Sequence, residues 1–189
     1  MMMIRHGQSE FNVIYAKTRK DPGIRDPRLT DLGKEQARKA SDHLRPLGLT
    51  RIIASPYWRT LETAEVIAEA LDLPISTNPI VGEHCAFVSD LGSPVADLRE
   101  RWPHVEFGDL ADEWWPNFVE EHHHVDSRAR AFRDWARAVE PRHDILVVSH
   151  WGFLRALTGH EMPNCGMLRF DPVSGHPGGG DIVAPRDAW

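Results

Sequence analysis

The chain opens with Met1-Met2-Met3-Ile4-Arg5-His6-Gly7-Gln8-Ser9, in which apolar residues lead into an arginine, a histidine and a glycine. The pattern returns later, where Ile145-Leu146-Val147-Val148 leads into Ser149-His150-Trp151-Gly152. A short apolar run bounded in this way predicts a buried strand of a parallel sheet. Ligands of such sheets bind beyond the carboxyl ends of the strands, so we expect the two histidines to meet in one cleft. The arginine beside the first histidine indicates that the cleft binds an anion.

The composition is that of a globular protein. Of 189 residues, 41% are hydrophobic and 26% are charged, with a net charge of −6. This charge argues against a general nucleic-acid surface, so an anion site has to be a local cluster of arginine and histidine. No apolar run approaches the roughly 20 residues of a membrane span, and the start of the chain lacks the pattern of a signal peptide. Cys85 and Cys165 are too few for a disulfide framework, so we expect a reduced, cytoplasmic protein with both cysteines in its interior.

Strand and helix patterns alternate along the chain. Strands are expected at 1–5, 51–54, 75–77, 144–148 and 166–171, with helices at 30–47, 58–71, 93–101, 126–139 and 151–158. Ser93 is the expected cap of its helix, and residues 9–20 are expected to form a loop or a short helix. The alternation predicts an α/β fold with three layers, α/β/α, around a mostly parallel sheet. We expect one domain over 1–189, with an irregular excursion at about 78–124 over the ligand edge of the sheet.

Four sequence blocks occur in a characteristic order and spacing. They are Arg5-His6-Gly7-Gln8-Ser9 with Asn12, Asp26–Gly33 with Gln36-Ala37, Ser55-Pro56-Tyr57-Trp58-Arg59 with Glu62-Thr63-Ala64, and Ser149-His150. With these blocks the chain resembles the histidine phosphatase superfamily, the phosphoglycerate-mutase-like proteins, from Ile4 to about Asp171. It departs from the family at Trp151, where a glycine is frequent, and a tryptophan there is expected to narrow the pocket mouth.

The resemblance implies a phosphatase that acts on small-molecule phosphomonoesters through a phosphohistidine on His6, without a metal or another cofactor. It implies that Glu83, in Val81-Gly82-Glu83-His84, is the proton donor, because the family usually carries its donor at this place. The catalytic residues would then be His6, Glu83, His150, Arg5 and Arg59, and the substrate-binding residues Arg5, Ser9, Asn12, Arg59, His150 and Trp151.

The chemistry of these residues agrees with that implication. Phosphoryl transfer spreads negative charge over three oxygens, and arginine forks suit a phosphate group. The attacking histidine, His6, has to be neutral at one ring nitrogen, whereas His150 would donate best when it is protonated beside the anion. Glu83 would protonate the leaving alkoxide, a task that needs a raised pKa.

Other residues compete for roles. Glu10 and Glu62 are alternative acids, and both are expected on helix surfaces. His122-His123-His124 suggests a metal site, but consecutive histidines do not converge on one ion, so we expect a solvated loop. Trp102, Trp114 and Trp115 are expected to pack the excursion, and some of them to line the substrate mouth.

Three alternative functions remain open at this point. A mutase would return the phosphoryl group to a second hydroxyl, but glycolytic mutases of the family are longer and carry an insertion that 189 residues barely accommodate. A non-catalytic module would bind phosphorylated ligands, but such proteins typically lose the nucleophile or an arginine. A metal-dependent hydrolase is disfavoured because the fixed cation of Arg5 would repel a metal ion. The sequence indicates neither the substrate nor the oligomeric state.

Overall fold

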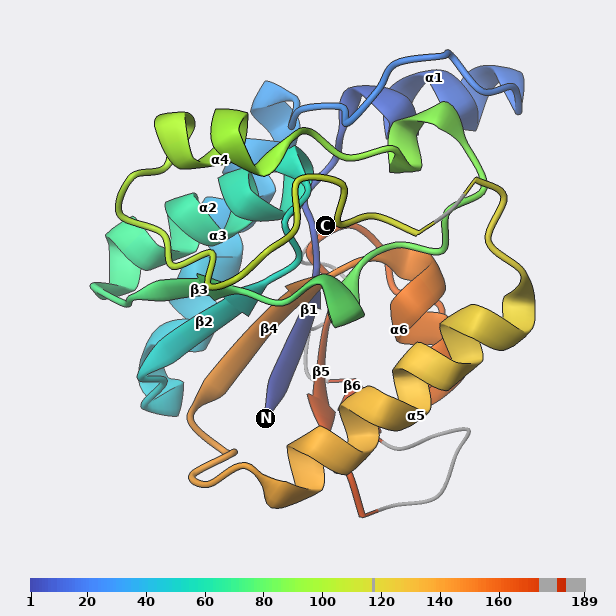
Figure 1. Cartoon of the computed structure of the whole chain (residues 1–189). Helices are drawn as coiled ribbons and strands as arrows, with labels where there is room; N and C mark the ends of the chain where they lie inside the picture. The colour runs from blue at the N-terminus through green and yellow to red at the C-terminus, as the bar shows by residue number, and fades with distance from the viewer. Residues whose placement is uncertain (117, 174–179, 183–189) are drawn as a thin grey trace.

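The computed structural model describes residues 1–116, 118–173 and 180–182, and a mostly parallel sheet lies at its centre (Figure 1). Within these residues the strand order is β3-β2-β4-β1-β5-β6. The strands are β1 (Met2–Arg5), β2 (Arg51–Ala54), β3 (Ile75–Thr77), β4 (Ile145–Ser149), β5 (Met167–Phe170) and β6 (Gly180–Ile182). The first four are mutually parallel, whereas β5 is antiparallel to β1 and β6 is antiparallel to β5.

Successive side chains of the central strands enter two different cores. Met2 and Ile4 belong to one hydrophobic cluster, and Met1 and Met3 belong to the other. All residues of β4 are buried, and its four apolar residues, Ile145 to Val148, alternate in the same way. Strand side chains point alternately to opposite faces, so a strand covered on both sides has to be apolar throughout. This is why these strands are continuous apolar runs in the sequence.

Helices cover both faces of the sheet (Figure 1). The helices are α1 (Glu10–Thr18), α2 (Asp31–Leu44), α3 (Trp58–Leu71), α4 (Val95–Arg101), α5 (His122–Ala138) and α6 (Trp151–Thr158), with 3₁₀ turns η1 (Arg45–Leu47), η2 (Pro79–Val81) and η3 (Val88–Asp90). Buried residues of α2, α3 and α4 join one core, and those of α5 and α6 join the other. The expected three-layer α/β/α fold is therefore confirmed.

Two helices begin at residues that differ from the prediction. The helix expected from Ser93 begins at Val95, after Pro94. The hydroxyl of Ser93 instead donates to Asp26, 2.8 Å away, and ties this loop to the loop before α2. The Ser93 cap was therefore wrong, because a distant carboxylate competes for the same hydroxyl.

The helix expected from residue 126 begins one turn earlier. His122, His123 and His124 form the exposed first turn of α5 rather than a loop. Apolar periodicity starts only at Val125, so it gave no sign of this polar turn. Within the described part of the chain, no group of three or more His, Cys, Asp or Glu side chains has the arrangement of a metal site.

The 78–124 region contains η2, η3 and α4, with irregular backbone between them. In the tail, Gly178 and Gly179 lie outside the described residues, while Gly180 begins the unpredicted strand β6. None of the helices in the described ranges is long and apolar enough to cross a membrane.

Candidate active site

Strand pairing brings the two strand-end histidines together. Arg5 of β1 is in register with Ser149 of β4, so His6 and His150 leave the sheet at the same edge. Their ring centroids are 5.2 Å apart in an edge-to-face arrangement. The meeting of the two histidines therefore follows from parallel register.

The backbone beside His6 fixes its tautomer. Nδ1 lies 2.7 Å from the carbonyl oxygen of Gly7, an oxygen that can only accept, so Nδ1 carries the proton and Nε2 keeps a free lone pair. Burial, with the nearby positive charges of Arg59 and Arg5, places the pKa of His6 well below its usual value. His6 is therefore neutral and suited to attack through Nε2.

His150 lies behind His6 rather than on the cavity wall. Its side chain has no exposed surface, and its Nε2 is 2.9 Å from the hydroxyl of Ser55. Its Nδ1 is buried without a hydrogen-bond partner among the described residues. Burial, then the charges of Arg59 and His6, lower the pKa of His150 well below its usual value, which favours the neutral ring.

Two arginines reach the cavity, Arg5 from the end of β1 and Arg59 from the start of α3. Arg5 donates through Nη1 to the carbonyl of Met162 at 2.9 Å, and burial lowers its pKa to about 10. Arg59, in the first turn of α3, donates to the carbonyl of Ser89 at 2.9 Å and to Asp90 at 3.1 Å. Both guanidinium groups are thus anchored at the wall of the cavity.

The loop after β1 presents a polar cradle. Ser9 caps α1, and the Asn12 oxygen Oδ1 accepts from the Ser9 backbone and hydroxyl. Asn164 donates its Nδ2 both to Asn12, at 3.0 Å, and to the carbonyl of His6. These contacts occupy Oδ1 and leave the Asn12 NH₂ group as the donor toward a ligand.

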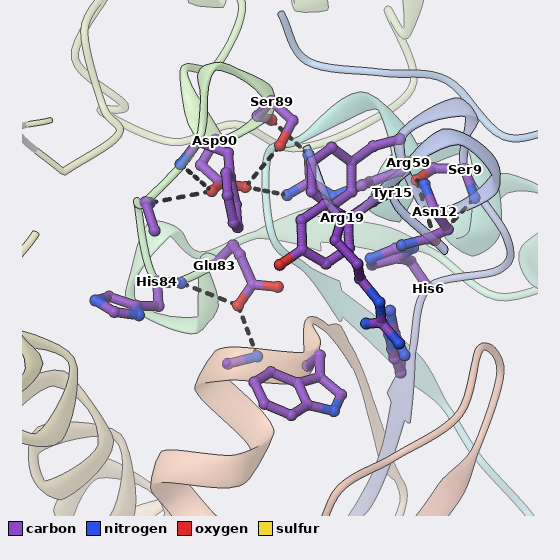
Figure 2. Close-up of a pocket in the computed structure, with 16 residues that line it drawn as sticks. His6, Ser9, Asn12, Tyr15, Arg19, Arg59, Glu83, His84, Ser89 and Asp90 are labelled. Carbon is purple, nitrogen blue, oxygen red and sulfur yellow. Dashed lines mark hydrogen bonds and ion pairs between the residues drawn. The ribbon is translucent and has the colours of Figure 1, made fainter. Parts of the chain in front are cut away.

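Glu83 faces the same cavity, across from His6 (Figure 2). One carboxylate oxygen, Oε1, accepts from the backbone N–H groups of His84 at 2.9 Å and Gly152 at 2.8 Å. The other oxygen, Oε2, makes no hydrogen bond among the described residues. Burial, and after it the negative charge of Asp90, raises the pKa of Glu83 above its usual value. The charge of Arg59 and the hydrogen bond from the His84 N–H oppose this shift. Glu83 therefore has a free oxygen that can carry a proton.

Gly152 allows this approach of Glu83 to the start of α6. A Cβ atom at position 152 would lie 2.5 Å from Oε1 of Glu83 and 2.9 Å from the Cβ of His84. The preceding Trp151 lines the cavity as expected. A side chain is tolerated at position 151, whereas glycine is required at position 152.

A partly buried ion pair holds the segment that carries Glu83. Arg128 of α5 forms a bidentate ion pair with Glu120, in which Nε donates to Oε1 at 2.9 Å and Nη2 donates to Oε2 at 2.8 Å. The same guanidinium donates to the carbonyls of Ile80 and Gly82 at 2.9 Å and of Glu83 at 3.0 Å. No sequence pattern marked Arg128 as a partner of the Glu83 segment, because the carbonyls that it contacts there are 45 to 48 residues away along the chain.

If Glu83 is the proton donor that the resemblance implies, replacing Arg128 with methionine is expected to lower kcat for alkyl phosphates roughly 10–100-fold, because displacement of an acid by about an ångström has effects of this size. Inhibition by vanadate should be nearly unchanged, since the arginines and His6 remain in place. Steady-state kinetics with alkyl and activated aryl phosphates measures the effect, and thermal unfolding checks the fold.

Arg130→Met, an exposed arginine on the same helix, is the control for the Arg128 variant, and Arg128→Lys should restore part of the activity. Equal losses with alkyl and activated aryl substrates would argue that Arg128 supports the fold rather than the position of Glu83.

Asp90 is a second residue beside the cavity that the sequence did not reveal. Its Oδ1 pairs with Arg59, and its Oδ2 accepts from the backbone N–H groups of Ala86 and Phe87. Burial raises the pKa of Asp90 above its usual value, although Arg59 opposes that shift. Asp90 thereby orients Arg59 and places a negative charge near Glu83.

The cavity itself has a volume of about 400 Å³ and lies beyond the strand ends. Its inner wall includes Arg5, His6, Arg59 and Glu83, and residues 83–90 of the excursion form one side (Figure 2). Ser9, Asn12 and Trp151 also line it, whereas His150 does not. The volume suits a small molecule rather than an extended polymer.

The competing acids lie elsewhere. Glu10 is exposed on α1, as expected. Glu62 was expected on a helix surface, but it is 9% exposed and accepts from the backbone N–H of Leu29 at 2.6 Å. That expectation was wrong, because the loop before α2 folds over Glu62. Neither side chain lines the cavity.

Both cysteines are buried, and two of the tryptophans pack against other aromatic rings. Cys85 and Cys165 are buried free thiols, and burial raises the pKa of each to about 12. Trp102 is fully buried against Trp58, and Trp114 packs edge-on against Tyr57. The expected packing role of Trp102 and Trp114 is confirmed.

Known structures share this architecture. A mycobacterial glucosyl-3-phosphoglycerate phosphatase, solved with VO3, superposes with a TM-score of 0.63 at 23% identity, over 89% of this chain and 90% of that one. An ecdysone phosphate phosphatase from Bombix mori, solved with tungstate, superposes with a TM-score of 0.66 at 18% identity, over 97% and 91%. At such identities these similarities show the fold alone.

The sequence comparisons identify the family. A probable phosphoglycerate mutase GpmB from Proteus mirabilis is 37% identical over 81 residues, which is 43% of this chain and 36% of that protein. The match thus spans about a third of the relative's length. The model of the histidine phosphatase superfamily (branch 1) matches residues 1–174. Because that match covers most of the chain and includes both strand-end histidines, the protein belongs to the histidine phosphatase superfamily.

Proposed function

We propose that this protein is a phosphatase that hydrolyses small phosphomonoesters through a phosphohistidine on His6. The observation that carries the proposal is the 2.7 Å contact between Nδ1 of His6 and the carbonyl of Gly7, which directs the reactive lone pair to Nε2. The arginines Arg5 and Arg59 lie at the same cavity, so a phosphate group has both a nucleophile and cationic partners there.

In the first half-reaction, Nε2 of His6 attacks phosphorus and the bond between phosphorus and the ester oxygen breaks. Arg5 and Arg59 stabilise the charge that spreads over the three remaining oxygens. Glu83, whose pKa burial raises, gives its proton to the departing alkoxide and forms the alcohol. His150, charged only beside the bound anion, adds positive charge behind His6.

In the second half-reaction, water attacks the phosphohistidine and the bond between nitrogen and phosphorus breaks. The ionised Glu83 removes a proton from the water, which returns Glu83 to its acid form. Inorganic phosphate leaves, and His6 regains its neutral tautomer with the proton on Nδ1. No metal ion takes part in either proposed step.

A mutase is the second candidate, because the curated relatives are named probable phosphoglycerate mutases. It would share the first half-reaction and then transfer the phosphoryl group to a hydroxyl of a second molecule instead of water. Product analysis separates the two activities. A phosphatase accumulates inorganic phosphate from phosphoglycerates, whereas a mutase interconverts their isomers with little phosphate release.

A panel of phosphorylated metabolites, monitored by phosphate release, tests the proposed function. We expect release that saturates with at least one class of phosphomonoester. Binding of phosphate analogues with no turnover of any panel member would overturn hydrolysis and favour a non-catalytic phosphate-binding module.

Chelation is expected to leave this activity unchanged, and vanadate or tungstate to inhibit competitively, because each anion offers oxygens to Arg5 and Arg59. Initial rates before and after treatment with EDTA, and inhibition at several substrate concentrations, measure both effects. Activity that disappears on chelation and returns only with a divalent ion would contradict the proposed mechanism.

A further inference from the structure

The outer wall of the cavity is an aromatic cluster that the proposed phosphate chemistry does not use. Phe11 and Tyr15 stack with ring centroids 5.1 Å apart, and Phe87 lies 5.2 Å from Phe11 and 5.3 Å from Tyr15. All three rings are half-buried and line the cavity. Two segments far apart in the sequence therefore build one apolar wall.

Helix α1 supplies most of this wall and buries little else. None of its nine residues is fully buried, so the helix adds no residue to either core. Phe11 and Tyr15 are four residues apart and share one helix face. An amphipathic helix normally directs such a face into a core, whereas here the face borders a cavity.

Arg19 continues the same face one turn further and places a cation at the rim. It ends α1 with a left-handed backbone, at φ 55°, and its guanidinium lies 5.8 Å from the centre of the Tyr15 ring. Arg19 is exposed, lines the cavity and makes no ion pair within the described residues. Figure 2 shows it beside Tyr15, with Glu83 further along the wall.

We propose that the preferred substrates are phosphomonoesters whose alcohol carries an aromatic ring with a carboxylate at its far end. The proposal rests on the proposed phosphatase function and assigns its substrate class. The phosphate occupies the inner site near His6, the ring packs against Phe11, Tyr15 and Phe87, and the carboxylate pairs with Arg19. Rings pack favourably on aromatic walls, and a guanidinium binds a carboxylate through two parallel hydrogen bonds.

The ring is tested with benzyl phosphate and ethyl phosphate. Both esters release a primary alkoxide, so both need the proton of Glu83 to a similar degree. A difference in kcat/KM between them therefore reports the contribution of the aromatic ring. We expect kcat/KM to be roughly tenfold higher for benzyl phosphate, the size of one good aromatic contact. Phe87→Ala and Tyr15→Ala should each reduce this ratio, whereas Leu32→Ala, an exposed apolar residue elsewhere, should preserve it.

The rim cation is tested with 4-carboxybenzyl phosphate against benzyl phosphate. An exposed ion pair supports a preference of about threefold for the carboxylated ester at low salt. Arg19→Gln should remove that preference, and Arg38→Gln, an exposed arginine on α2, should keep it. A preference that survives in Arg19→Gln would overturn the role of Arg19.

Binding of non-hydrolysable analogues separates this proposal from the phosphatase function. Calorimetry with benzylphosphonate and ethylphosphonate should show the same preference for the ring. Equal affinities and equal kcat/KM values would overturn the substrate class while leaving the phosphatase intact. Preferential binding of benzylphosphonate without phosphate release from any ester would support the aromatic wall and overturn the proposed hydrolysis.

Discussion

Replacement of His6 by alanine is expected to abolish phosphoenzyme formation and turnover together. Removal of a catalytic nucleophile lowers kcat by a factor on the order of 10⁴–10⁶. Rapid quenching with a labelled phosphomonoester should trap an acid-labile, base-stable phosphoenzyme in the wild type and none in the variant.

Stability should change little in His6→Ala, because the imidazole forms one hydrogen bond, to its neighbour Gly7, and Thr63 still binds the Gly7 N–H. Thermal unfolding checks this, and His6→Asn provides a second variant if alanine impairs folding. His43→Ala, an exposed histidine on α2, is the matched control. A His6→Ala protein that retains more than a small fraction of activity would refute the assignment.

Glu83→Gln is expected to slow phosphoenzyme formation from alkyl phosphates by roughly 10²–10⁴-fold, the usual contribution of a positioned general acid. Glutamine keeps the shape but cannot give the proton. Aryl phosphates with acidic phenols should suffer much less in this step, because their leaving group needs no proton. The burst must be measured separately from turnover, since breakdown of the phosphoenzyme uses Glu83 as a base.

The pH dependence gives a second measure of Glu83. The raised pKa of Glu83 lets the carboxyl keep its proton to higher pH than an ordinary glutamate does. As the pH rises through that pKa the acid form is lost, so wild-type kcat/KM for alkyl phosphates should fall. Glu83→Gln should lose this alkaline limb, and Glu35→Gln, an exposed glutamate on α2, should retain it. Equal losses of burst rate for alkyl and activated aryl substrates would exclude Glu83 as the acid.

The sequence by itself determined the layers of the fold and the meeting of the two histidines. Each has a local cause. Apolar runs of strand length specify buried parallel strands, and His6 and His150 follow such runs directly. The pairing of Arg5 with Ser149 then leaves the histidines no other place than one sheet edge. Arg5 and Arg59 were predicted for a similar reason, since Arg5 ends β1 and Arg59 lies at the start of the helix that follows β2.

Only the tertiary structure decided which partners hold these side chains in place and how their pKa values shift. Arg128 reaches Glu83 across 45 residues, Asn164 reaches Asn12 across 152, and Asp90 reaches Arg59 across 31. No local pattern marks such partners, because a hydrogen bond between segments depends on where the chain returns in space. The pKa values of His6 and Glu83 likewise depend on the tertiary structure. Burial and neighbouring charge shift each of them, and these are set by all the segments packed around the group.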